Sequence, residues 1–107
     1  MRAVGYMWRA EVSFRIQIAI LAFTLFLAWG LEISRTDFLI IMFAIGVVLA
    51  VEAVNTALER IGDTINQAPD PRVAHIKDLG SAASFLIGIA TFLVWCEVFI
   101  PPLIAFL

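Results

Sequence analysis

Residues 38–58 read FLIIMFAIGVVLAVEAVNTAL, and this stretch decides the fold. It is about 21 residues long, enough for a helix to cross the ~30 Å hydrocarbon core of a bilayer. Apolar side chains occur all round it instead of on one face, which is typical of a helix surrounded by lipid. Its polar members are Glu52, Asn55 and Thr56, all in the second half. We therefore expect a transmembrane helix over 38–58, with an extension outside the membrane to about residue 65.

Two more apolar blocks accompany this span. Residues 16–31 carry no charged side chain, and residues 79–100 carry one, Glu97. The chain of 107 residues is 63% hydrophobic with a mean hydropathy of +1.01, which is more apolar surface than a soluble domain of this size can bury. The sequence thus predicts an all-α integral membrane protein, a single domain over 1–107 with three transmembrane helices.

The segment before the first span, residues 1–15, has the pattern of an amphipathic helix that lies at the membrane interface. Arg9 falls on its polar side, whereas Trp8 falls on the apolar side, where an indole suits the interfacial region. Glu11 also falls within the apolar side, with Arg15 one turn above it. A carboxylate on the lipid or bundle side of such a helix is a candidate functional group.

Basic residues are unevenly distributed between the two ends of the spans. Arg2, Arg9 and Arg15 precede the first span and three more lie over 60–77, whereas the turn after the first span has Arg35. The positive-inside rule then places the N-terminus and segment 60–77 in the cytoplasm and the C-terminus outside. The net charge is −2 and no basic cluster occurs, so nucleic acid is not an expected partner.

Four polar side chains follow one edge of the second span. Spaced i, i+3, i+7 and i+11 in a stripe about 80° wide, they are Glu52, Asn55, Glu59 and Asp63. An ionised Glu52 in hydrocarbon costs on the order of 3 kcal/mol, so this carboxylate should face protein, water or a ligand. Glu59 and Asp63 considered alone fit an ordinary solvated helix end.

These groups suit phosphoryl transfer, which needs a metal ion, a cation that binds phosphate, and a base. Grouped carboxylates can bind Mg²⁺, and a carboxylate such as Glu52 can act as a general base. Lys77 and Asp78 stand at the start of the third span, where backbone N–H groups at a helix N-terminus favour phosphate. The alternative for Lys77 is a positive-inside anchor.

Three blocks of the sequence carry a family resemblance. Glu52-Ala-Val-Asn-Thr-Ala-Leu-Glu-Arg-Ile-Gly-Asp63 fits the signature E-x-x-N-[ST]-A-[IL]-E-x-x-x-D, and Lys77-Asp-Leu-Gly-Ser-Ala-Ala83 fits K-D-x-G-S-A-A. Near the N-terminus stand Gly5-Tyr6-x-Trp8 and Glu11-x-x-Phe14-Arg15. In type, order and spacing these blocks resemble the prokaryotic diacylglycerol kinase family over nearly the whole chain, and their combination is highly specific.

The resemblance implies a protein of the bacterial inner membrane that acts in lipid metabolism and phospholipid biosynthesis. It implies a homotrimeric helical bundle in which each subunit has a surface helix and three transmembrane helices. The active sites would lie at the cytoplasmic interface and be shared between subunits. The reaction would be MgATP-dependent phosphorylation of a membrane lipid hydroxyl, converting diacylglycerol to phosphatidic acid.

The resemblance also implies roles for individual residues. Glu52 would be the catalytic base that takes the lipid hydroxyl proton, and Glu11 and Glu59 would hold the metal ions. Nucleotide binding would involve both of these glutamates together with Tyr6, Asp63, Lys77 and Asp78. Substrate binding would involve Glu52 together with Trp8, Arg15, Asn55 and Ser81.

Two alternatives remain open at this point. Undecaprenol kinases share the acidic signature, and Phe14-Arg15-Ile16-Gln17 is somewhat like their F-[RK]-I-H, whereas Gly80-Ser-Ala-Ala83 favours diacylglycerol. The alternative outside the enzymes is a small proton-coupled exporter that uses Glu52 as its proton site. Such exporters usually have four spans with the acidic residue in the first, and here the first span is uncharged.

Overall fold

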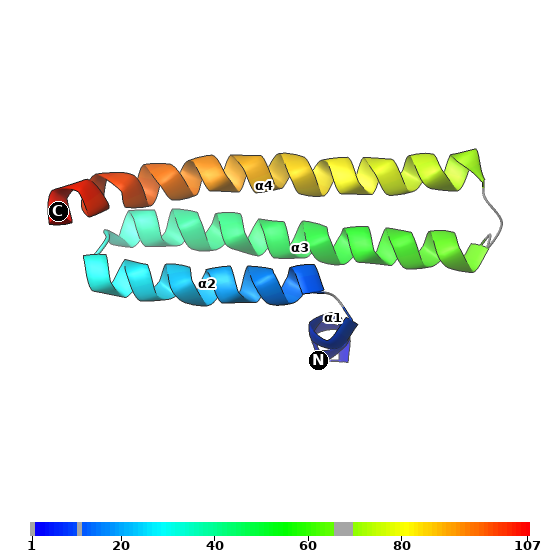
Figure 1. Cartoon of the computed structure of the whole chain (residues 1–107), viewed down its shortest axis with the longest axis horizontal. Coiled ribbons are helices and arrows are strands. Elements are labelled where there is room, and N and C mark those ends of the chain that lie inside the picture. The colour runs from blue at the N-terminus through cyan, green and yellow to red at the C-terminus, as the bar shows by residue number, and fades with distance from the viewer. Residues whose placement is uncertain (1, 11, 66–69) are drawn as a thin grey trace.

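The computed structural model describes residues 2–10, 12–65 and 70–107, and within them the chain forms four helices. These are α1 (Arg2–Ala10), α2 (Val12–Leu31), α3 (Arg35–Ile65) and α4 (Pro71–Phe106). Helices α2, α3 and α4 lie side by side with alternating direction, and α1 lies across the start of α2 (Figure 1). The molecule is elongated, 55 × 26 × 21 Å. We call the end where α3 leads into α4 the hairpin end, and the end where α2 turns into α3 the turn end.

Helices α2, α3 and α4 are the helices of the described residues that are long and apolar enough to cross a membrane. Large apolar side chains point outward along all three, and Trp29, Phe43 and Phe85 are each more than two-thirds exposed. In water such a surface would aggregate, whereas lipid tails cover it without cost. The prediction of an all-α, multi-pass membrane protein with a short N-terminal helix and three spans is confirmed.

The helix bounds differ in places from the boundaries drawn on the sequence. Helix α2 begins at Val12, so residues 12–15 continue the first span instead of belonging to the surface helix. Helix α4 begins at Pro71 and runs to Phe106. Its last turns contain Pro101 and Pro102, which have no backbone N–H to donate. With 31 and 36 residues, α3 and α4 are about 46 and 54 Å long, well beyond the ~30 Å of hydrocarbon. Both therefore extend out of the membrane.

Local hydrogen bonds account for the turn between α2 and α3 and for the start of α4. Glu32 adopts φ 52°, and the N–H of Ile33 returns to the carbonyl of Ala28 at 3.3 Å, which closes α2 as a left-handed cap. The hydroxyl of Ser34 then accepts from the N–H of Asp37 at 3.1 Å and starts α3. At the hairpin end the Asp70 carboxylate accepts from the N–H of Arg72 at 2.9 Å, and Pro71 occupies the first turn of α4.

The core that joins all three spans lies toward the turn end. Ile41 and Phe99 are fully buried there and pack with Ala28 of α2. The indole N–H of Trp95 in α4 donates to the Thr24 hydroxyl in α2 at 3.0 Å, and that hydroxyl donates to a carbonyl one turn earlier at 2.8 Å. The Trp95 and Phe99 rings lie 4.7 Å apart. A hydrogen bond thus ties α2 to α4 inside an otherwise apolar interface.

Helices α3 and α4 approach each other closely at two glycines. A Cβ on Gly62 would lie 2.9 Å from Val73 Cγ1 and 3.2 Å from the Lys77 side chain. A Cβ on Gly80 would overlap the side-chain oxygen of Asn55. Small residues at such crossings let two membrane helices pack backbone to backbone. The α3–α4 hairpin is therefore the closely packed unit of the fold, and both glycines lie in its hairpin-end half.

The first prediction concerns the bond between α2 and α4. Trp95→Phe removes the indole N–H and part of a buried ring, so we expect it to lower the free energy of unfolding by about 0.5–2 kcal/mol. Trp29→Phe is the matched control, because Trp29 is 80% exposed on α2 and should have little effect. Unfolding with sodium dodecyl sulfate in mixed micelles measures both variants. Equal stability of the Trp95 variant and the wild type would contradict the prediction.

Candidate functional site

The polar edge of α3 consists of Glu52, Asn55, Glu59 and Asp63. Because α3 is continuous through Ile65, the four side chains keep the register expected from their spacing. Glu52, Asn55 and Glu59 are partly buried, whereas Asp63 is exposed near the end of the helix. The edge thus leads from a shielded carboxylate within the bundle to a solvated one at the hairpin end.

Asn55 lies at the closest contact between α3 and α4. Its amide oxygen is buried against Gly80 and has no hydrogen-bond partner among the described residues. A buried polar atom without a partner usually costs 1–3 kcal/mol, so such atoms in a native fold point to a strained or ligand-binding position. Asn55, which the family resemblance places in the site, is therefore held in one position by the helix crossing.

Asp63 and Lys77 join the two long helices at the hairpin end. The Lys77 ammonium donates to the Asp63 carboxylate at 2.5 Å, between side chains that are 36% and 61% exposed. This hydrogen bond, together with the charge of Lys77, holds the pKa of the Asp63 carboxyl below its usual range. Two residues expected to bind nucleotide thus form an exposed ion pair between α3 and α4 at the hairpin end.

The other predicted site residues are placed less centrally. Tyr6 of α1 lies under the Arg60 guanidinium of α3, with 5.5 Å from the guanidinium carbon to the ring centroid. Asp78 and Ser81 are exposed on α4, as are Trp8 on α1 and Arg15 on α2. Glu11, the expected metal ligand between α1 and α2, lies outside the described residues.

The carboxylates do not form an all-protein metal cage in the part of the chain that the structure describes. No three acidic, histidine or cysteine side chains of those residues are close enough together to hold an ion. Glu52 and Glu59 are two helical turns apart, about 10 Å along the axis, so one ion could not contact both. Mg²⁺ commonly uses one or two carboxylates together with waters and substrate phosphates, so it does not need such a cage.

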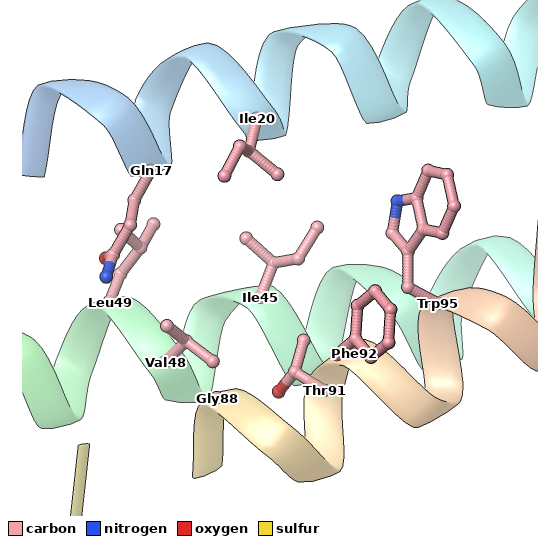
Figure 2. A pocket seen from close by; sticks show the side chains of 9 residues that line it. All are labelled: Gln17, Ile20, Ile45, Val48, Leu49, Gly88, Thr91, Phe92 and Trp95. Atoms are coloured by element: carbon pink, nitrogen blue, oxygen red, sulfur yellow. The ribbon is translucent and has the colours of Figure 1, made fainter. Parts of the chain in front are cut away.

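An apolar pocket of about 430 Å³ lies between α2, α3 and α4 on the membrane side of the polar edge. Its size is within the range of small-molecule sites, ~300–1,000 Å³. The residues that line it are Gln17 and Ile20 of α2, Ile45, Val48 and Leu49 of α3, and Gly88, Thr91, Phe92 and Trp95 of α4. In Figure 2 the side chains of Ile20 and Ile45 point toward each other across the pocket.

The pocket continues the polar edge into the membrane. Ile45, Val48 and Leu49 precede Glu52 by seven, four and three residues, so all of them lie on the face of α3 that carries Glu52. Leu49 is one turn away from Glu52, about 4.5 Å along the axis. The same face of α3 therefore has an apolar half that lines the pocket and a polar half that begins at Glu52.

Two polar residues of this pocket were not identified from the sequence. The amide oxygen of Gln17 and the hydroxyl of Thr91 are buried and have no hydrogen-bond partner within the described ranges. In Figure 2 the Gln17 side chain extends from α2 toward α3. A polar amide in a span without charged residues was the available signal. Spacing along one helix cannot show which side chains of other helices that amide meets.

Comparison with known proteins identifies the family. The family model for prokaryotic diacylglycerol kinase matches residues 1–99. The chain is 27% identical over 103 residues to the diacylglycerol kinase of Escherichia coli (strain K12), which covers 89% of this chain and 84% of that protein. It is 26% identical over 95 residues to the undecaprenol kinase of Bacillus subtilis (strain 168), covering 89% and 77%. These matches confirm the family resemblance and favour a lipid kinase over an exporter.

The second prediction concerns the helix crossing at the site. Gly80→Ala places a methyl group against the Asn55 side chain and Leu58, so the helices must separate, and we expect a loss of about 1–3 kcal/mol in stability. Gly46→Ala is the matched control, since nothing lies within 4 Å of a Cβ at that position of α3. Thermal unfolding in detergent compares the two variants. Equal melting temperatures would contradict the close contact between Asn55 and Gly80.

Proposed function

The chain belongs to the prokaryotic diacylglycerol kinase family, a family of ATP-dependent lipid kinases, and we propose that its substrate is diacylglycerol. The reaction transfers the γ-phosphoryl group of ATP to the free hydroxyl of the lipid and yields phosphatidic acid and ADP. The observation that carries this proposal is the apolar pocket whose wall on α3 reaches Leu49, one helical turn from Glu52. It supports a substrate with a long apolar part and a reactive polar head.

The pocket suits one hydrocarbon chain of the lipid. Its side chains are apolar except for Gln17 and Thr91. The buried Gln17 amide oxygen can accept a hydrogen bond, and the buried Thr91 hydroxyl can donate or accept one. An ester group near the head of an acyl chain offers an acceptor for the Thr91 hydroxyl. A lipid seated with its chain between α2, α3 and α4 would direct its hydroxyl along the face of α3 toward Glu52.

Glu52 then acts as the general base. Its carboxylate takes the proton of the lipid hydroxyl while the hydroxyl oxygen bonds to the γ-phosphorus of ATP. The bond between the γ-phosphorus and the bridging oxygen breaks, and its electron pair leaves with ADP. Partial burial of Glu52 keeps water away from the reacting oxygen, which favours transfer to lipid over hydrolysis.

The ATP phosphates are placed at the hairpin end, beside Glu59, Asp63 and Lys77. Lys77 has three N–H donors, so it can contact a phosphate while it keeps its bond to Asp63. A Mg²⁺ ion held by Glu59 and Glu11 with the ATP phosphates would neutralise phosphate charge. Asp78 on α4 and Tyr6 on α1 complete the proposed nucleotide site.

We place the hairpin end in the cytoplasm, where ATP is available, and the C-terminus outside. The basic residues near that end support this orientation. We also propose a homotrimer with shared sites, because the exposed Trp8, Arg15 and Ser81 can contribute to the lipid site from a neighbouring subunit. Asn55, fixed by Gly80, would orient the lipid head.

The third prediction tests the base. Glu52→Gln keeps the size of the side chain but removes the proton acceptor, so ADP release that depends on added diacylglycerol should fall by about 10²–10⁴-fold. The assay uses purified protein, MgATP and diacylglycerol in mixed micelles, with and without lipid, and with chelator to remove Mg²⁺. Chelation should abolish turnover.

The control for this variant is Glu97→Gln, which removes the single carboxylate of the third predicted span. Glu97 is exposed on α4 toward the turn end, whereas the polar edge lies in the hairpin-end half of α3. Turnover should therefore be unchanged. Full activity of a folded Glu52→Gln protein would refute the proposed base. Absence of lipid-dependent ATP turnover in the wild type would refute the proposed function.

The fourth prediction concerns which lipid is used and where its chain lies. We expect faster turnover with diacylglycerol than with undecaprenol in side-by-side assays; the opposite order would identify the alternative kinase. Gly88→Leu fills part of the pocket and should raise KM for diacylglycerol by about tenfold or more. Ala90→Leu is the control, because Ala90 is exposed on the same helix. An unchanged KM in the Gly88 variant would place the lipid elsewhere.

A further inference from the structure

Arg60 is a charged residue beside the site that the proposed reaction does not use. It follows Glu59 on α3 and is rotated by about 100° from it, so it lies outside the polar edge. Its guanidinium carbon lies 5.5 Å from the centroid of the Tyr6 ring of α1, within the ~6 Å that defines a cation–π contact. The contact therefore joins the surface helix to the part of α3 that carries Glu59.

The position of α1 depends on few contacts. Helix α1 has nine residues and lies across the start of α2, away from the close packing of α3 and α4 (Figure 1). Met7 is buried, whereas its neighbours Tyr6 and Trp8 are exposed. A helix this short is marginal by itself, so specific contacts to the bundle decide where it lies. Among these contacts the Tyr6–Arg60 pair reaches α3 next to Glu59.

We propose that Arg60 is a positioning residue that, through Tyr6, holds α1 beside Glu59 and so supports binding of the metal–nucleotide. The inference rests on the proposed function, since it deepens the account of the same nucleotide site. The physical basis is the planar guanidinium, which covers an aromatic face and keeps its charge at all working pH values. In this role Arg60 acts on the site through α1.

A double-mutant cycle on nucleotide affinity tests the proposal. The probe is Mg²⁺ with a non-hydrolysable ATP analogue, and the variants are Tyr6→Leu, Arg60→Ala and the two combined. Each single variant should weaken binding about two- to five-fold, which corresponds to ~0.5–1 kcal/mol at ~1.4 kcal/mol per tenfold. The combined variant should lose less than the sum of the two single losses, because both substitutions remove the Tyr6–Arg60 contact.

Conservative variants separate stacking from charge. In a Tyr6→Phe background the ring remains, so Arg60→Ala should weaken binding as much as in the wild type, whereas in the Tyr6→Leu background it should have a smaller effect. Arg60→Lys keeps the charge but loses the planar group, so we expect an intermediate affinity. Arg9→Ala removes a charge from α1 outside the contact and should leave affinity unchanged. Melting temperatures of all variants show whether the bundle is intact.

The outcomes are separable from those of the kinase assay. Additive effects of the two substitutions, or unchanged affinity in either single variant, would overturn the role of Arg60 even if the wild type phosphorylates diacylglycerol. Absence of lipid-dependent turnover in the wild type would overturn the proposed function. The double-mutant cycle on nucleotide affinity would still test the Tyr6–Arg60 contact. The proposal is supported if the loss caused by Arg60→Ala is coupled to that of Tyr6→Leu and is not coupled to that of Tyr6→Phe.

Discussion

The close approach of α3 and α4 at Gly62 and Gly80 sets the geometry of the hairpin end. Without a Cβ at these positions the two helices pack near enough for Lys77 to reach Asp63 and for the Asn55 amide to be held against α4. Lipid provides no hydrophobic force between spans, so such packing must come from shape and from a few polar contacts. The candidate site is therefore built on the most closely packed pair of helices and not on a loop.

A single face of α3 then carries two environments in sequence. Toward the turn end it lines an apolar pocket, and from Glu52 onward it presents carboxylates and an amide. This division follows the bilayer, because hydrocarbon excludes charge whereas the interface and water solvate it. A lipid kinase needs this junction, since its two substrates come from opposite sides of it: the lipid from the membrane and ATP from water.

Much of the architecture could be predicted from the sequence, and the remainder could not for identifiable reasons. The three spans follow from long apolar runs, and the alignment of Glu52 with Asn55 and Glu59 follows from the helix period. The sequence pattern puts the boundary between the surface helix and the first span after residue 15, whereas α2 begins at Val12. Amphipathic and fully apolar patterns overlap over such short stretches, so composition does not locate the break.

The sequence by itself determined that the chain spans the membrane three times and that one edge of α3 is polar. Both properties are local, since a backbone in hydrocarbon must satisfy its hydrogen bonds within a helix and a helix repeats every 3.6 residues. The tertiary structure decided that Gln17 and Trp95 line one pocket with Leu49, that Asn55 meets Gly80, and that Arg60 covers Tyr6. These contacts join side chains of different helices, and they depend on how closely and at what rotation the helices pack.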